Sequence, residues 1–343
     1  MRIRAICRSA HLSDVTVVIP SYNSIATIEA AVESALAQTI PVNVIVVDDG
    51  SKDATVSKVQ QLAKQNANLT LIAQPQNRGP SAARNRAIAE AKTCWVAILD
   101  ADDYMHPDRL RKMVDVGVKQ KLDLVADDLV RVPATPLPAS GTRLWADQSI
   151  GLVHMDAGRF ALENLNSRTG NRRELGYLKP IIRSDFLTAH AIAYNEDMRL
   201  SEDYDIYMRC LLAGARFGVI DPCGYFSVDY PNSLSKEFAS ADLRRVLDRD
   251  REYLMHPGLA DEAKRSISKH KIQAYKHWAW MHLIERVRDR DLAGAVATFV
   301  APPVIVATLV GRVIRHALGK EPVPQSDDRE AKVQSIEQIL AAS

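Results

Sequence analysis

The chain has 343 residues, enough for one large domain or two of ordinary size, and its 47% hydrophobic and 25% charged residues are typical of a globular protein. A formal net charge of +2 argues against nucleic-acid binding by the chain as a whole. The cysteines lack the close spacing of a metal site, so we expect reduced thiols in a cytoplasmic protein: Cys7, Cys94, Cys210 and Cys223.

The first hundred residues alternate between apolar runs and stretches with apolar side chains at helical spacing. The apolar runs predict four strands, within 15–23, 41–51, 68–75 and 94–103. The stretches between them predict three helices, within 24–39, 52–65 and 81–92. Such alternation is typical of parallel strands covered by helices on both faces. We therefore expect an α/β fold with a doubly wound, mostly parallel sheet.

The second half is less regular. We expect a helix within 106–120, a strand within 122–132 and a proline-rich loop at 133–142. A helix followed by a strand is expected within 201–220. From about Ala239 the sequence is helical and basic. The chain should thus divide into an α/β domain at 12–238, a basic helical extension at 239–320 and a polar, mobile tail at 321–343.

Residues Leu292–Gly311 carry no charge and are long enough to span a bilayer. Pro302 and Pro303 lie in the middle of this run and would break or kink a single helix. The surrounding region from Lys264 to Lys320 holds 11 lysine or arginine residues against three acids. Three interpretations stay open: a helical hairpin on a membrane surface, a buried pair of core helices, or a spanning helix, which fits the proline pair poorly.

Polar residues follow three of the predicted strands: Ser21–Asn23, Asp48–Gly50 and Asp100–Asp103. Ligands of open α/β sheets bind at the carboxyl ends of the strands. We therefore expect these three clusters to converge in space.

The third cluster places three acids within four positions, and their mutual repulsion calls for a positive charge. Asp100 and Asp102 should point to one side of the strand, because side chains two residues apart do so, while Asp103 turns into the next loop. A divalent cation with a substrate diphosphate would suit two such carboxylates. A helix cap formed by Asp103 or Asp108 would explain one acid but not three.

The other two clusters carry weaker signals. Asp48 and Asp49 could simply form a turn that leads into the next helix, but a carboxylate there could also accept hydrogen bonds from a nucleobase or a ribose. Tyr22 could stack on a base. Arg84 lies near a helix start, where a cation gains nothing from the helix dipole, so it either contacts an anionic ligand or pairs with the acid clusters.

Five stretches, in this order, resemble the family 2 glycosyltransferases with the GT-A fold: "VVIPSYN", "VIVVDDGSKDAT", "NRGPSAARNRAI", "AILDADD" and "LSEDYDIYMR". The resemblance covers about 15–235 and identifies 12–238 as a GT-A catalytic domain. The basic helical region from about Ala239 and the stretch "RLSEDYDIYMRCLLAGARF" are similar to bacterial exopolysaccharide glucosyltransferases of the succinoglycan type.

The resemblance implies roles for particular residues. Asp203 would be the catalytic base and Asp102 would hold Mn²⁺ or Mg²⁺. The nucleotide-sugar would contact six residues: Pro20, Tyr22, Glu29, Asp49, Arg84 and Asp100. In one departure from the family pattern, Tyr230 stands where many members carry a histidine that helps to hold the metal or diphosphate, so Asp229 or water would have to complete the metal site.

The implied reaction is an inverting transfer of a sugar, with glucose from UDP-glucose expected, to a lipid-linked or polysaccharide acceptor at the inner face of the cytoplasmic membrane. Asp203 would take the proton of the acceptor hydroxyl, and the metal would replace the general acid that a glycosidase needs. Taken alone, Glu202 and Asp203 could be acids that merely favour a helix start. A binding module with a dead site is a further alternative.

Two other enzyme classes use similar sheets. A nucleotidyltransferase would need a glycine-rich phosphate loop with Lys or Arg after the first strand. A dinucleotide-dependent oxidoreductase would need G-x-G-x-x-G at the same turn. The stretch from Pro20 to Thr27 has neither pattern.

Overall fold

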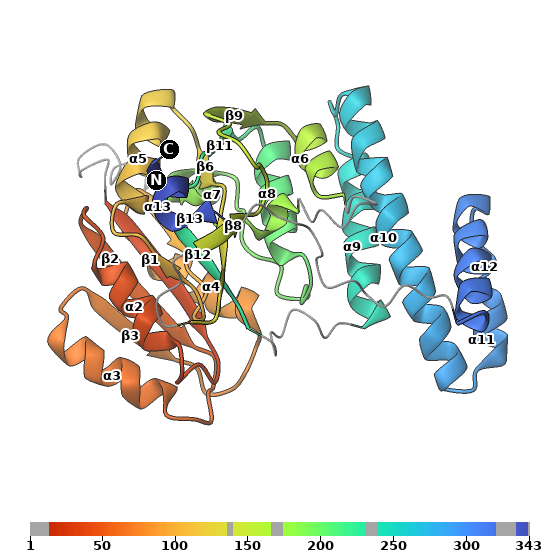
Figure 1. Ribbon diagram of the computed structural model, residues 1–343, viewed down its shortest axis with the longest axis horizontal. Helices are drawn as coiled ribbons and strands as arrows, with labels where there is room; N and C mark the ends of the chain where they lie inside the picture. Colours follow the sequence, from red (N-terminus) through yellow and green to blue (C-terminus); the bar gives the residue numbers. More distant parts are fainter. Residues whose placement is uncertain (1–13, 136–139, 166–173, 231–238, 320–333, 342–343) are drawn as a thin grey trace.

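The computed structural model describes residues 14–135, 140–165, 174–230, 239–319 and 334–341. Two sheets and a helical extension make up this part of the chain (Figure 1). The central sheet has eight strands in the order β3-β2-β1-β4-β10-β6-β11-β9. Their bounds, in chain order, are β1 Val15–Ser21, β2 Val42–Asp48, β3 Leu69–Ala73, β4 Trp95–Ile98, β6 Leu124–Asp127, β9 Leu152–Met155, β10 Ile181–Arg183 and β11 Phe217–Ile220.

The central sheet is mostly parallel, as predicted. Strands β3, β2, β1 and β4 run parallel to one another, and so do β6 and β11. Strand β10 is antiparallel to both β4 and β6, between which it lies, and β9 is antiparallel to β11 at the edge. The apolar side chains of β1, β2 and β4 are buried, which is why these strands read as continuous apolar runs in the sequence.

Helices connect the first strands and cover the sheet: α2 (Ile28–Leu36), α3 (Thr55–Gln65), α4 (Pro80–Glu90) and α5 (Arg109–Gln120). Helix α2 starts later than expected, because Ser24–Thr27 form a turn. The backbone N–H of Ser24 donates to the hydroxyl of Thr55, and that of Ile25 donates to Asp53. Further along the chain lie α6 (Ala157–Glu163), η1 (Leu175–Tyr177), α7 (Ser184–Ala189) and α8 (Glu202–Leu212).

The smaller sheet has the order β13-β8-β7-β12-β5, with bounds Gln334–Ser335, Ser140–Arg143, Val130–Pro133, Tyr225–Asp229 and Tyr104–Met105. The single strand expected within 122–132 is in fact two strands, β6 and β7, that belong to different sheets. The chain turns between them because the carboxylate of Asp128 accepts the N–H groups of Trp145 and Ala146, which pulls the chain away from the central sheet.

The end of the chain also departs from expectation. A mobile tail was expected from residue 321, but 334–341 pack on the smaller sheet as β13 and α13 (Ile336–Ala341). The side chain of Ile339 is fully buried against Val130, Val132 and Phe226. Ile336 and Leu340 pack beside it, so three apolar side chains of α13 anchor this segment to the smaller sheet.

The helical extension consists of α9 (Ser240–Leu254), α10 (Asp261–Arg288), α11 (Leu292–Ala297) and α12 (Pro303–Ala317). Helix α10 packs along α9 and against α6, where Gly158 allows close approach: a Cβ there would lie 2.9 Å from Cα of Ala263. Helices α11 and α12 pack on the distal end of α10, as Figure 1 shows, around Ala279, Leu283, Ala295, Ile305 and Leu309.

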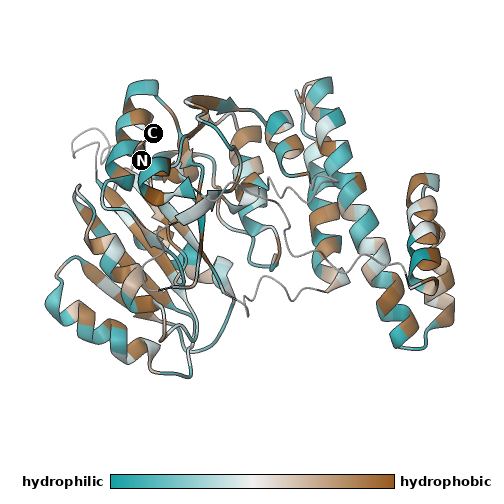
Figure 2. Cartoon of the chain, viewed as in Figure 1, coloured by the Kyte–Doolittle hydropathy of each residue, from teal (hydrophilic) through white to brown (hydrophobic). Residues whose placement is uncertain are grey.

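The uncharged run of 292–311 is thus divided between two short helices, with the proline pair at the break. In the part of the chain that the structure describes, no helix is both long enough and apolar enough to cross a membrane. Figure 2 shows hydrophobic residues distributed over α11 and α12. Several are exposed, including Leu292, Val296 and Val300.

Candidate functional site

The first two polar clusters meet where β1 and β2 end. The N–H of Asp49 donates to the carbonyl of Ser21 (2.8 Å), and the N–H of Asn23 donates to the hydroxyl of Ser51 (2.8 Å). The carboxylate of Asp48 accepts the backbone N–H groups of Gly50 and Ser51, so it shapes the turn itself. Two of the three clusters that were predicted to converge therefore meet.

Asp49 is buried and holds a neighbouring loop. Its two carboxylate oxygens accept the N–H groups of Arg78 (2.8 Å) and Gly79 (2.7 Å), which precede α4. Burial raises the pKa of Asp49. Gly50 allows this loop to pass close by, since a Cβ at Gly50 would lie 2.9 Å from the backbone nitrogen of Asn77. Each carboxylate oxygen keeps a second lone pair with which to contact a ligand.

The third cluster does not continue β4 as a strand. The N–H of Asp103 donates to the carbonyl of Asp100 (3.1 Å), so these residues form a turn, and the alternation expected of a strand does not apply. Asp103 does not lead into the loop as predicted. Its carboxylate is buried and accepts the hydroxyl of Tyr225 (2.7 Å) and the N–H of Val228 (2.9 Å) on β12.

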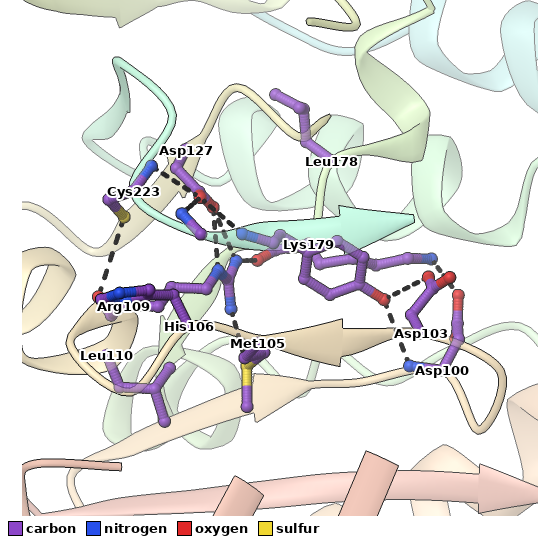
Figure 3. A network of polar contacts seen from close by, with 12 residues as sticks. Asp100, Asp103, Met105, His106, Arg109, Leu110, Asp127, Leu178, Lys179 and Cys223 are labelled. Carbon is purple, nitrogen blue, oxygen red and sulfur yellow. Dashed lines mark hydrogen bonds and ion pairs between the residues drawn. The ribbon is translucent and has the colours of Figure 1, made fainter. Parts of the chain in front are cut away.

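Asp100 is paired with two protein cations. Nη2 of Arg84 lies 3.0 Å from its Oδ1, and Nζ of Lys179 lies 3.0 Å from its Oδ2. Figure 3 shows the Lys179 side chain extending to the Asp100 and Asp103 turn. Burial raises the pKa of Asp100, but the two cations outweigh burial and hold it well below its usual range. Two side chains thus supply the positive charge that the acids required.

Arg84 resolves an alternative that the sequence left open. Its guanidinium is buried, and besides Asp100 it contacts Glu202 at the start of α8 (2.9 Å from Nη1 to Oε1). It also lies over the ring of Tyr194, 5.2 Å from the centroid. Arg84 therefore pairs with the acid clusters in this structure.

Asp203 completes the arrangement. Its Oδ2 lies 2.5 Å from Nζ of Lys179, and its Oδ1 is buried without a hydrogen bond among the described residues. Together with the contacts of Arg84, this makes a chain of four ion pairs whose two ends, Glu202 and Asp203, are neighbours in the backbone. It is here called the ion-pair ring: Arg84, Asp100, Lys179, Asp203 and Glu202. The ring joins the end of β4 to the first turn of α8.

Sequence reasoning missed Lys179. It stands in "YLKPII", just before β10, and its ammonium is buried. The charges of Asp100 and Asp203 outweigh the effect of burial and raise the pKa of Lys179 above its usual value. The available signal was a lysine within an apolar run, a residue type that is rarely buried without a partner.

Four of the six predicted nucleotide-site residues lie outside the ion-pair ring, Asp49 among them. Tyr22 follows β1 and is partly exposed, and Glu29 on α2 is exposed and pairs with Lys58 of α3 (2.9 Å). Pro20 lies within β1, opposite Val47 of β2.

Asp102 differs from its two neighbours. Its side chain reaches solvent and forms no ion pair with the described residues. The surrounding protein still desolvates the carboxyl group, and this, with the charge of Asp100, raises the pKa of Asp102. Among the described residues, no group of three or more His, Cys, Asp or Glu side chains could hold a metal. One free carboxylate fits Mg²⁺ or Mn²⁺ only if substrate phosphates supply further oxygens, as is usual for these ions.

The position that departs from the family pattern is near this carboxylate. Burial and the charges of Asp102 and Asp103 raise the pKa of Tyr230. Asp229 lies exposed at the end of β12. The stretch that follows, 231–238, lies outside the described residues.

Known proteins resemble this chain in sequence. The model of the family described as Glycosyl transferase family 2 matches 16–181. Two relatives from Rhizobium meliloti (strain 1021) are each 32% identical: the succinoglycan biosynthesis protein ExoU, over 88% of this chain and 87% of its own length, and the succinoglycan biosynthesis protein ExoO, over 84% and 82%.

Two solved structures share the fold. Residues 1–349 of S. aureus TarS in complex with UDP align with a TM-score of 0.62 at 19% identity, over 94% of this chain and 96% of that one. The mannosyltransferase PcManGT from Pyrobaculum calidifontis, in complex with GDP-Man and Mn²⁺, aligns with a TM-score of 0.53 at 18% identity, over 90% and 88%. At such identity they bear on the fold alone, and they confirm the predicted GT-A-type α/β architecture with a helical extension.

Proposed function

Since this chain belongs to glycosyl transferase family 2, we propose that it transfers a sugar from a UDP-sugar to a hydroxyl group of a lipid-linked or polysaccharide acceptor, in exopolysaccharide synthesis. The names of ExoU and ExoO support the pathway, since both are succinoglycan biosynthesis proteins. TarS complexes with UDP and with UDP-GlcNAc support a uridine nucleotide. Glucose is the sugar that we propose.

The observation that carries the proposal is a buried carboxylate with one oxygen unused. Asp203 lies beside the turn that carries Asp100 and Asp102, and its Oδ1 has no hydrogen-bond partner among the described residues. A buried acceptor atom left unpaired costs free energy unless a ligand satisfies it. A substrate hydroxyl at this place would do so.

The chemistry follows from this placement. Asp203 takes the proton as the acceptor oxygen attacks the anomeric carbon from the face opposite the diphosphate. A single displacement of this kind inverts the configuration. Asp102 would hold Mn²⁺ or Mg²⁺, which when bound would offset the negative charge of the departing diphosphate.

The donor would lie over the ends of β1, β2 and β4. Tyr22 and Pro20 would line the base, Asp49 would accept its N–H groups, and Asp100 and Arg84 would face the ribose and diphosphate. Glu29, on the next helix, would border this pocket once Lys58 releases it.

The acceptor side would face a membrane. We place the protein in the cytoplasm, peripherally on the inner face of the cytoplasmic membrane. Exposed apolar side chains on α11 and α12 stand next to arginines, including Arg286, Arg288 and Arg312. This combination suits a surface of anionic lipid.

A panel of nucleotide-sugars tests the proposal. The purified protein is incubated with each donor and Mn²⁺, Mg²⁺ or EDTA, and released nucleotide is measured. We expect release from UDP-glucose that EDTA abolishes and that Asp102→Ala lowers by at least about 100-fold. Release that is undiminished in EDTA or in Asp102→Ala would contradict the metal assignment, and a protein that turns over no sugar nucleotide would contradict the function.

A further inference from the structure

A single ammonium group links the donor side of the site to the proposed base. Nζ of Lys179 lies 3.0 Å from Oδ2 of Asp100 and 2.5 Å from Oδ2 of Asp203. We propose that Lys179 is a positioning residue of the transfer reaction, which by holding Oδ2 of Asp203 makes Oδ1 the oxygen that accepts the proton. This inference rests on the proposed function, in which Asp203 is the base.

The backbone around Lys179 is fixed by buried groups. Its carbonyl oxygen accepts a hydrogen bond from Nη2 of Arg109 (2.5 Å), and the carbonyl of Leu178 accepts one from the hydroxyl of Tyr207 (2.9 Å). Figure 3 shows the side chain running from this anchored backbone toward Asp100. Both Arg109 and Tyr207 are fully buried. Buried residues of the domain therefore fix the backbone from which the Lys179 ammonium extends.

The other charges of the ion-pair ring restrict how Asp203 can turn. Glu202, the adjacent residue, is paired with Arg84, and Arg84 is paired with Asp100. Turning the Asp203 carboxylate away from this position would break a short, buried contact to Lys179. The buried hydroxyl of Tyr194 interacts with Asp203: burial, the charge of Asp203 and a hydrogen bond with it raise the pKa of Tyr194 well above its usual value. An incoming hydroxyl that donates to Oδ1 of Asp203 would therefore lie beside the hydroxyl of Tyr194.

The transfer step then has a defined course. The acceptor O–H bond breaks and its proton moves to Oδ1 of Asp203. The acceptor oxygen bonds to the anomeric carbon, and the bond from that carbon to the diphosphate oxygen breaks, leaving its electron pair on the diphosphate. Lys179 stays protonated throughout and keeps its contact with Oδ2.

A double-mutant cycle in UDP-glucose hydrolysis tests this role, with water as the acceptor and Mn²⁺ present. The single variants are Lys179→Met and Asp203→Asn, and the third is their combination. We expect Lys179→Met to lower kcat about 100-fold while KM for UDP-glucose changes less than about tenfold. In the Asp203→Asn background the same substitution should cost less than about threefold, because the base on which it acts is already gone.

Two further variants separate positioning from folding. Lys179→Arg can keep both contacts and should recover kcat to within about tenfold of the unmodified protein. Arg183→Met removes a partly exposed cation from its pair with Asp185 at the other end of β10 and should leave kcat within about twofold. Circular dichroism checks that every variant is folded.

The outcomes distinguish the two proposals. An Asp203→Asn variant that keeps full hydrolysis would overturn the proposed base, whatever Lys179 does. If Asp203→Asn is strongly impaired but still measurable, an unaffected Lys179→Met, or equal fold losses from Lys179→Met in both backgrounds, would overturn only the positioning role. A crystal structure of Lys179→Met gives an independent reading: we expect the Asp203 carboxylate to turn toward Arg84, and an unchanged carboxylate would count against the inference.

Discussion

At the scale of single residues, the domain depends on a fully buried ion pair outside the predicted site. Nη2 of Arg109 lies 2.8 Å from Oδ1 of Asp127, and both side chains are inaccessible to solvent. The other oxygen of Asp127 accepts the N–H groups of Cys223, Gly224 and Tyr225. Through Arg109, this pair also holds the backbone of Lys179.

We expect Arg109→Leu to lower the free energy of unfolding by about 3–5 kcal/mol, because it leaves the charge of Asp127 buried without its partner. Arg86→Leu is the matched control, since the exposed pair of Arg86 with Glu90 should contribute at most about 0.5 kcal/mol. Urea denaturation followed by circular dichroism measures both. Similar small changes in the two variants would show that water reaches Asp127.

The same scale shows how far the sequence could predict the site. Asp49, Asp100 and Asp102 were singled out because acids at the ends of strands are visible in the sequence, whereas Asp203 was chosen only through the resemblance to a family. The pairing of Asp100 with Lys179 was not, since it joins residues about eighty positions apart and no motif marks a lysine before a short strand.

At the scale of elements, apolar runs predicted the first four strands well, because strands that are buried on both faces have apolar residues at nearly every position. The prediction was wrong at 122–132. There the break between β6 and β7 depends on carboxylates that accept backbone groups from residues 145–146 and 223–225, contacts that only the folded chain provides.

At this scale, we predict that the exposed apolar side chains of α11 and α12 contact a membrane surface. Val296 and Val300 are 70% and 86% exposed, so charging them should not disturb folding. We expect the double variant Val296→Asp and Val300→Asp to sediment with anionic liposomes at least about fivefold less than the unmodified protein. Lys119→Asp on α5, an exposed position away from α11 and α12, should sediment normally. Equal sedimentation of all three proteins would exclude this surface as the membrane contact.

At the scale of the whole molecule, the chain leaves the catalytic domain for the helical extension and then comes back. Ile339 on α13 returns to the smaller sheet and packs against Val130, Val132 and Phe226. Strand β12 of this sheet leads to Asp229 and Tyr230, beside the acids of the site. The last described residues therefore pack on the strand that carries Asp229, although they are more than a hundred positions away from it in the sequence.

Ile339→Asp places a charge in this buried position, and we expect it to lower the free energy of unfolding by about 2–4 kcal/mol. Gln338→Asp, on the exposed face of the same helix, should change it by less than about 0.5 kcal/mol. Hydrogen exchange should show faster exchange of the β7 and β12 amides in the first variant only. Unchanged exchange would mean that α13 rests on the sheet without stabilising it.

The return of the chain also makes α9 to α12 an insertion in topological terms, since elements of one sheet flank them on both sides. Within it, α11 and α12 pack on the distal end of α10 and can be lengthened, shortened or exchanged without moving the catalytic fold. Helix α9 belongs to that fold, since the hydroxyl of Tyr253 donates to the buried carboxylate of Asp205 on α8 (2.5 Å). Donor chemistry and the choice of the surface at which the enzyme works could therefore diverge independently. A fusion partner joined directly after β12 would remove β13 from its place, whereas one that replaces only α11 and α12 would keep it.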